Sequence, residues 1–186
     1  MRGNTRTHLS NCTRNVHTAL HHDPVLSRLV DTSISRTDYM RALSAFAVFY
    51  TTIETQRKIL DLWPEYSLDA ECAALQMDLG TNVSNLASSF KFGCRATALG
   101  GLYVAYGAAF GRAHMRKNCV ARIPESSHAF LKLSNQPDRW RSLVDTLDTF
   151  ASNHLALRRM ETGATIAFQL MNRAAVDMRA PALQRL

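Results

Sequence analysis

Residues 35–64 read SRTDYMRALSAFAVFYTTIETQRKILDLWP, and this stretch sets the expected fold class. Its large apolar side chains recur at helical spacing, which places them on one face of an α-helix; they are Tyr39, Leu43, Phe46, Tyr50, Ile53 and Leu60. Ser35 and Asp38 have the spacing of a capping box, and Trp63–Pro64 is a helix-ending pair. The stretch therefore predicts one long, half-buried helix.

The same period recurs along the rest of the chain. It appears at Leu99, Leu102, Tyr103, Tyr106 and Phe110, at Leu143, Leu147 and Phe150, and at Met160, Ile166, Leu170 and Met171. No clean alternation of apolar and polar residues, which is typical of strands, interrupts it. We therefore predict an all-α, single-domain bundle of about seven or eight helices. Residues 121–137 form the one long irregular connection, with room for a short helix.

The chain has 186 residues, which is enough for one well-buried domain. We expect the helical domain to span residues 9–178, with a flexible N-terminus at residues 1–8 and a flexible C-terminus at residues 179–186.

Composition narrows the classes of function. The formal net charge of +7 indicates a polyanion, an anionic membrane or an acidic protein as partner. The sequence contains no compact stripe of Arg and Lys, so we expect no nucleic-acid binding. It contains no run of about 20 apolar residues, so we expect no membrane span. The four cysteines are scattered without a metal-binding spacing, which is typical of reduced thiols in the cytoplasm.

Four glycines lie inside one helical pattern, namely Gly100, Gly101, Gly107 and Gly111. Each glycine costs a helix about 1 kcal/mol relative to alanine, so the group requires a compensating role. Gly107 and Gly111 are four residues apart and share a face. That face either lets the backbone approach a flat or bulky ligand or packs closely against another helix, and the sequence leaves both explanations open.

Three histidines, His17, His21 and His22, fall in the first predicted helix. His17 and His21 are one turn apart, but a metal held by both would need carboxylates, and the nearest is Asp23. A single axial ligand to haem needs only one imidazole and a pocket. A surface or core role is the remaining alternative.

The residues around these two features resemble those of the heme oxygenase family, in particular its bacterial, biliverdin-forming members. Residues 9–18, LSNCTRNVHT, are similar to the first helix, which presents the proximal iron ligand. Residues 20–29 and 35–54 are similar to the next segments, and residues 98–111, ALGGLYVAYGAAFG, resemble the kinked distal helix. Residues 160–168 resemble the final core helix. The resemblance spans residues 9–175, and its strength lies in the order and spacing of the motifs.

The resemblance implies the heme oxygenase fold, in which haem lies between a proximal first helix and a kinked, glycine-rich distal helix. His17 then corresponds to the proximal iron ligand, and Gly107 and Gly111 to the distal glycines. Arg14 and Tyr106 become candidate partners of the haem propionates, with a surface charge and a core aromatic as the respective alternatives. Arg173 and Lys117 are weaker candidates of the same kind.

The resemblance also implies a reaction. Haem is both cofactor and substrate, and O2 with an external electron donor, a ferredoxin or an NADPH-dependent reductase, converts it to biliverdin, carbon monoxide and ferrous iron. The chain departs from the family at three positions. Ala108 replaces an acidic or hydroxyl residue that holds an ordered water chain, Tyr106 replaces an acidic residue, and Arg112 replaces a second glycine. Arg112 is expected to narrow the pocket or to place a guanidinium at its edge.

Three alternatives to catalysis by haem cleavage stay open. A non-catalytic haem carrier of the same fold is favoured by Ala108 and Arg112. The chain could also be a helical relative that cleaves thiamin-like compounds or holds two irons. A di-iron site needs inward Glu and His at helical spacing, and Glu54, Glu71, Asp78 and Glu161 form no such pairs. Nucleic-acid binding has only the net charge in its favour.

Overall fold

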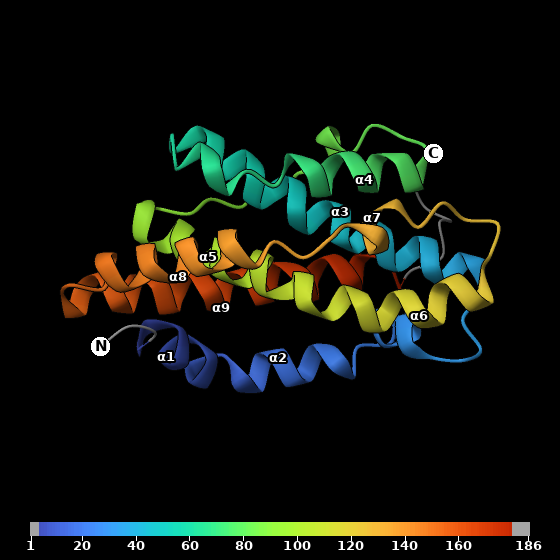
Figure 1. Cartoon of the computed structure of the whole chain (residues 1–186), viewed down its shortest axis with the longest axis horizontal. Coiled ribbons are helices and arrows are strands. Elements are labelled where there is room, and N and C mark those ends of the chain that lie inside the picture. The colour runs from blue at the N-terminus through green and yellow to red at the C-terminus, as the bar shows by residue number, and fades with distance from the viewer. Residues whose placement is uncertain (1–3, 180–186) are drawn as a thin grey trace.

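The computed structural model describes residues 4–179, and this part of the chain is helical without strands (Figure 1). It contains nine α-helices: α1 (Asn4–Cys12), α2 (Arg14–His21), α3 (Arg36–Ile59), α4 (Asp69–Leu79), α5 (Arg95–Ala108), α6 (Arg112–Arg122), α7 (Ala129–Lys132), α8 (Pro137–Phe150) and α9 (His154–Asp177). Four 3₁₀ helices join them: η1 (Ser27–Val30), η2 (Pro64–Tyr66), η3 (Ser84–Leu86) and η4 (Ala109–Gly111). The all-α prediction is confirmed.

Helix α9 is the centre of the bundle, because α1, α2, α3 and α5 all pack against it. In Figure 1 the N-terminal pair α1 and α2 lies along one edge of the molecule, and α3 with α4 lies along the opposite edge. Ion pairs fasten the N-terminal pair to α9 and its end, from His8 to Glu161 and from Asp23 to Arg179. The earlier residue of one stretch pairs with the earlier residue of the other, so α1 and α2 run parallel to α9.

Helix α3 begins as the sequence predicts. The Ser35 hydroxyl accepts a hydrogen bond from the Asp38 amide at 3.1 Å, and the Asp38 carboxylate reaches back to Ser35, which completes the capping box. The helix ends at Ile59, before the predicted Trp63–Pro64. Asp61 adopts a left-handed φ of 47°, which an α-helix does not allow, so the chain turns earlier than the proline.

Close packing around α5 depends on three glycines, two where it meets α9 and one beside the Phe92 ring. An added Cβ at Gly100 would lie 2.1 Å from the Met160 carbonyl oxygen, and one at Gly163 would lie 1.8 Å from that of Thr97. A Cβ at Gly101 would strike the Phe92 ring at 2.3 Å. These glycines therefore serve helix packing.

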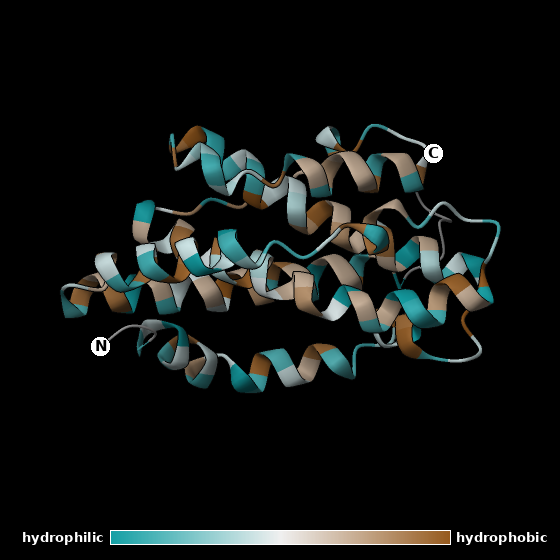
Figure 2. Cartoon of the chain, viewed as in Figure 1, coloured by the Kyte–Doolittle hydropathy of each residue, from teal (hydrophilic) through white to brown (hydrophobic). Residues whose placement is uncertain are grey.

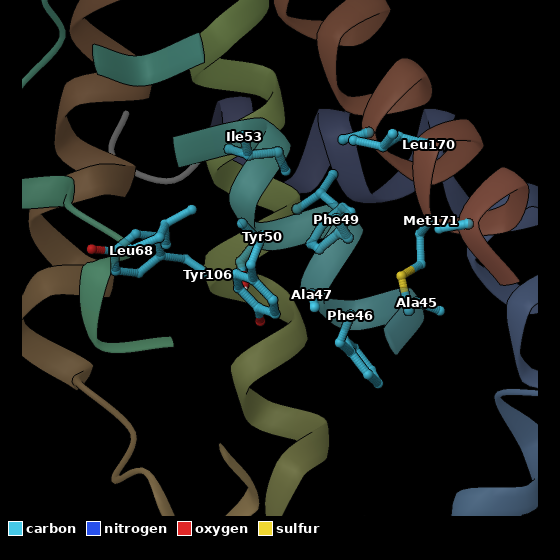
Figure 3. Packing of buried hydrophobic residues seen from close by; sticks show 14 of the residues in the cluster. Ala45, Phe46, Ala47, Phe49, Tyr50, Ile53, Leu68, Tyr106, Leu170 and Met171 are labelled. Atoms are coloured by element: carbon cyan, nitrogen blue, oxygen red, sulfur yellow. The ribbon is translucent and has the colours of Figure 1, made fainter. Parts of the chain in front are cut away.

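The buried core lies between α3 and its neighbours. Figure 3 shows α3 side chains such as Phe49 and Tyr50 between Leu170 and Met171 of α9 on one side and Leu68 and Tyr106 on the other. Brown and teal bands alternate along the helices in Figure 2, as expected where each helix turns one apolar face inward.

Three details differ from the sequence prediction or extend it. Residues 4–8, expected in the flexible N-terminus, belong to α1, where Thr5 and Leu9 are buried. The first helix breaks at Thr13, whose hydroxyl donates to the Leu9 carbonyl at 2.7 Å. The connection over residues 121–137 holds one short helix, α7, as predicted. Residues 1–3 and 180–186 lie outside the described residues, so the flexibility predicted there stays a prediction.

Candidate functional site

Helix α2 is amphipathic in sequence, yet none of its residues is buried. Val16 and Leu20 are only half-covered, and His17 is exposed. Apolar side chains of a stable amphipathic helix are normally covered, so this helix presents an incompletely covered apolar face.

The His17 ring is held by two aromatic contacts. It meets Phe168 of α9 edge to face, with ring centroids 5.6 Å apart, and His21 at 4.7 Å. Partial burial, together with the neighbouring His21, lowers the pKa of His17 below its usual value. The imidazole is therefore predominantly neutral at pH 7, which is the form that binds a metal. Phe168 is a neighbour that the sequence did not single out, because its contact depends on the register of α2 on α9.

The glycine-rich pattern does not form one continuous α-helix. Helix α5 ends at Ala108, the 3₁₀ helix η4 contains Gly111, and α6 follows directly. At this break the Ala109 amide donates to the Tyr106 carbonyl, three residues back, as in a 3₁₀ helix.

Gly107 and Gly111 differ from the packing glycines. An added Cβ at Gly107 has nothing within 4 Å, and one at Gly111 meets only the Met115 methyl at an ordinary 3.6 Å. Packing within the protein therefore does not account for glycine at these two positions. Of the two explanations that the sequence left open, close helix packing applies to Gly100, while open space lies beside Gly107 and Gly111; Gly101 packs against the Phe92 ring.

The N-terminal helices are tied to the α5–η4–α6 stretch at both ends. The Ser10 side chain of α1 lies beside the hydroxyl of Tyr103 in α5. Further along, the Asn118 side chain donates to the Leu29 carbonyl at 3.1 Å, and the Cys119 thiol lies 3.4 Å from the same oxygen. Both ties follow the chain direction, so the two stretches run in parallel.

These ties set the height of His17 relative to the glycines. Each helix rises about 1.5 Å per residue. His17 follows Ser10 by the same number of residues as Phe110 follows Tyr103, so we expect His17 to lie near the level of η4. On this expectation, the candidate iron ligand and the open faces of Gly107 and Gly111 occur at about the same level of the bundle.

The three charged candidates for the haem propionates, Arg14, Arg173 and Lys117, lie on the surface. Arg14 donates to the Asn11 side chain at 2.7 Å, and Arg173 pairs with Asp177 at 3.1 Å. Lys117 is exposed on α6. All three charges lie on the surface, and Arg14 and Arg173 already have polar partners within their own or the adjoining helix.

Tyr106 is a core residue. It is buried, its ring packs edge to face on Tyr66 at 6.2 Å, and its hydroxyl donates to the Ser67 carbonyl at 3.4 Å. Burial raises the pKa of Tyr106 to about 12, so it stays protonated. These contacts engage its hydroxyl and agree with the core-aromatic alternative.

Arg112 was expected to narrow the pocket or to place a guanidinium at its edge, and the structure turns its side chain into the protein interior. Its guanidinium is buried, 3.3 Å from the Glu71 carboxylate and over the Phe130 ring at 5.4 Å. The sequence could not show this, because the direction of a side chain at a helix junction depends on the local turn. Ala108 is half-buried at the end of α5.

Two surface clefts lie elsewhere on the molecule. One has a volume of about 650 Å³ beside Trp63 and Asp138, and the other has about 560 Å³ beside Cys94 and Arg159; both reach Phe150. None of the predicted haem-contacting residues lines them. Within residues 4–179, no three His, Cys, Asp or Glu side chains gather as metal ligands, and no helix is long and apolar enough to cross a membrane.

Comparisons with known proteins identify the fold of this chain through a structural match. No protein-family model matches the chain, and no curated protein matches its sequence. A crystal structure of the heme oxygenase from Neisseria meningitidis, described with NO and CO bound, matches with a TM-score of 0.72 and 21% sequence identity. The match covers 97% of this chain and 94% of that one. The chain therefore has the heme oxygenase fold, as the sequence resemblance implied.

Proposed function

We propose that this chain is a heme oxygenase, which cleaves haem to biliverdin, carbon monoxide and ferrous iron with O2 and electrons from a ferredoxin or an NADPH-dependent reductase. The observation that carries the proposal is local: on this fold, His17 is exposed beside Phe168, and Gly107 and Gly111 have open space where a side chain would lie. The fold alone would be equally compatible with unrelated chemistry.

The residues around this site fit a porphyrin. His17 supplies one nitrogen ligand, while the Phe168 ring and the half-covered Leu20 supply apolar contact. Glycine at 107 and 111 keeps the backbone free of side chains where a flat ring would approach. The uncovered apolar face of α2 would be buried by such a ring, which stabilises the complex.

When bound, haem supplies the iron at which oxygen is activated. The protein contributes position and charge. His17 would hold the iron through its neutral imidazole, and the open backbone around Gly111 would leave space free of side chains for a ligand. Arg14 and Lys117 are surface cations free to pair with the propionates. Tyr106 is not included among these contacts, because the core engages its hydroxyl.

A non-catalytic haem carrier is the second candidate, and Ala108 favours it. An alanine at the end of α5 brings no carboxylate or hydroxyl to organise water. Carrier and enzyme share the same ligation and differ only in turnover.

One experiment separates the two candidates. The purified protein is titrated with hemin, and ascorbate or a reductase system with O2 is then added. We expect about one haem per chain, followed by loss of the Soret band and growth of bilin absorbance. Haem that binds and never becomes bilin with any reductant would establish the carrier, and no saturable binding would refute both proposals.

We place the reaction in the cytoplasm. The four cysteines are free thiols in the structure, and a reducing compartment keeps thiols in that state. The net charge of +7 suits an acidic redox partner, which the charge would attract at low ionic strength.

A further inference from the structure

The break between α5 and α6 is fixed by buried polar groups on its inner side. Tyr50 of α3 is buried, and its hydroxyl donates to the Ala105 carbonyl at 3.1 Å. The same hydroxyl lies beside the Arg112 guanidinium, and Arg112 reaches Glu71 of α4 at 3.3 Å. Together these groups connect α3 and α4 to the last turn of α5, before η4, and to Arg112, directly after it.

Arg112 occupies this position at a cost. Its side chain is 3% exposed, and its Nε has no hydrogen-bond partner within the described residues. A buried ion pair with an unpaired donor is often less stable than an apolar pair of similar volume. A contribution to stability therefore does not by itself explain why an arginine stands at position 112, directly after η4.

We propose that Arg112 is a positioning residue, which with Glu71 and Tyr50 holds the η4 turn at a fixed distance from α2 and so decides how haem is presented at Gly107 and Gly111. The effect on haem rests on the proposed function, whereas the anchoring of η4 by Arg112 rests only on the contacts described above. The guanidinium acts from behind the turn, because it faces Glu71 and Phe130.

The mechanism is a change of backbone position. Without the guanidinium, one end of η4 loses its anchor, while Tyr50 still holds Ala105. The turn then samples more positions, and the open space at Gly111 varies in width. A bound porphyrin would be exposed to oxygen at more than one edge, so the product would change as well as the rate.

The first test uses the protein without haem. Hydrogen exchange followed by mass spectrometry compares wild type with Arg112→Met and with the double variant Arg112→Met/Glu71→Leu. The double variant removes both charges and is expected to fold. In both variants we expect amides in the segment 105–112 to exchange roughly tenfold faster. Unchanged exchange in that segment would overturn the inference, whatever haem does.

The second test adds hemin and measures the bilin isomer ratio and the C–O stretching frequency of the ferrous CO complex. We expect one main isomer in wild type, a mixture in Arg112→Met, a broadened CO band, and turnover reduced about ten- to a hundredfold. Arg112→Lys keeps the charge near Glu71 and should restore much of the wild-type isomer ratio. A variant that only lowers the stability of the fold would not change the isomer ratio or the CO stretching frequency.

Arg57→Met is the matched control. Arg57 forms a second buried pair with Glu54, at 2.6 Å, but anchors the loop after α3 through the Leu62 carbonyl. This variant should lose stability and keep the wild-type isomer ratio. A wild-type ratio in Arg112→Met as well would reduce Arg112 to a structural residue. A wild type that forms no bilin would refute the proposed function, and hydrogen exchange alone would then decide the inference.

Discussion

At the scale of single residues, the candidate site depends on whether a side chain is already engaged. His17 is exposed on α2 with only aromatic neighbours, whereas Tyr106, from a neighbouring motif, donates its hydroxyl into the core. In sequence, His17 matches the family's proximal ligand, whereas Tyr106 replaces an acidic residue and was a candidate only through its place beside Gly107. The difference between them arises from the direction of each side chain, which is a property of the packed helices.

The residue that carries the proposal is tested by His17→Ala. We expect the variant to lose the iron–imidazole bond, shift the Soret band and form no bilin, while some haem is retained by apolar contact. Added imidazole should restore the ligated spectrum. His21→Ala and His22→Ala are the matched controls, and the assignment is wrong if either of them loses ligation while His17→Ala keeps it.

At the scale of elements, the sequence predicts most of the helices, because their apolar period and caps are local properties. The capping box of Ser35 and Asp38 and the short helix in the 121–137 connection are confirmed. The inward turn of Arg112 is set by a tertiary contact with Glu71, and the break at Thr13 coincides with a local bond from its hydroxyl to the Leu9 carbonyl that the apolar period does not reveal. The glycines of α5 likewise look alike in sequence and differ in surroundings.

That difference predicts opposite effects of alanine on stability. Gly107→Ala adds a methyl group to open space and gains helix propensity, so it should stabilise the haem-free protein by about 0.5–1 kcal/mol. Gly100→Ala places a methyl group against the Met160 carbonyl and should destabilise it by about 2 kcal/mol or more. Urea unfolding of both variants measures the two changes. A stability loss in Gly107→Ala as large as in Gly100→Ala would contradict the open-space assignment.

A larger side chain at η4 tests what the open space is for. Gly111→Leu should fold with nearly wild-type stability, because only the flexible Met115 side chain is nearby. It should nevertheless impair oxygen binding and bilin formation strongly, since a branched side chain would occupy the volume beside the haem. Ascorbate-driven turnover and circular dichroism measure the two properties separately. Wild-type turnover in this variant would refute the assignment of η4 to the haem site.

At the scale of the whole molecule, several carboxylates link stability to pH. The Ser35 hydroxyl lowers the pKa of Asp38, and Lys58 with Ser67 lowers that of Asp69. Burial raises the pKa of Glu161, but hydrogen bonds from His8 and Arg158 outweigh it and lower the net value.

A carboxylate with a lowered folded-state pKa stabilises the fold above its unfolded pKa, and this contribution is lost as the pH falls through the folded value. We therefore expect the melting temperature to be flat with respect to these groups near neutral pH and to fall below about pH 4. Ser35→Ala should reduce the contribution of Asp38. A melting temperature that rises on acidification from pH 4 to pH 3 would contradict the assignment.

Haem binding is expected to stabilise the whole bundle, because α2 carries no buried residue of its own and is held mainly through α9. A ligand that binds only the folded chain at 100 times its Kd adds about 2.7 kcal/mol. For a chain of this length that corresponds to a rise of roughly 5–10 °C in melting temperature. The rise should grow with hemin concentration and be smaller in His17→Ala. Hydrogen exchange should show the largest gain of protection in α2 and around η4, since these two stretches would cover the porphyrin. Equal protection spread over α4 and α8 instead would place the haem elsewhere, beside the clefts at Trp63 and Cys94.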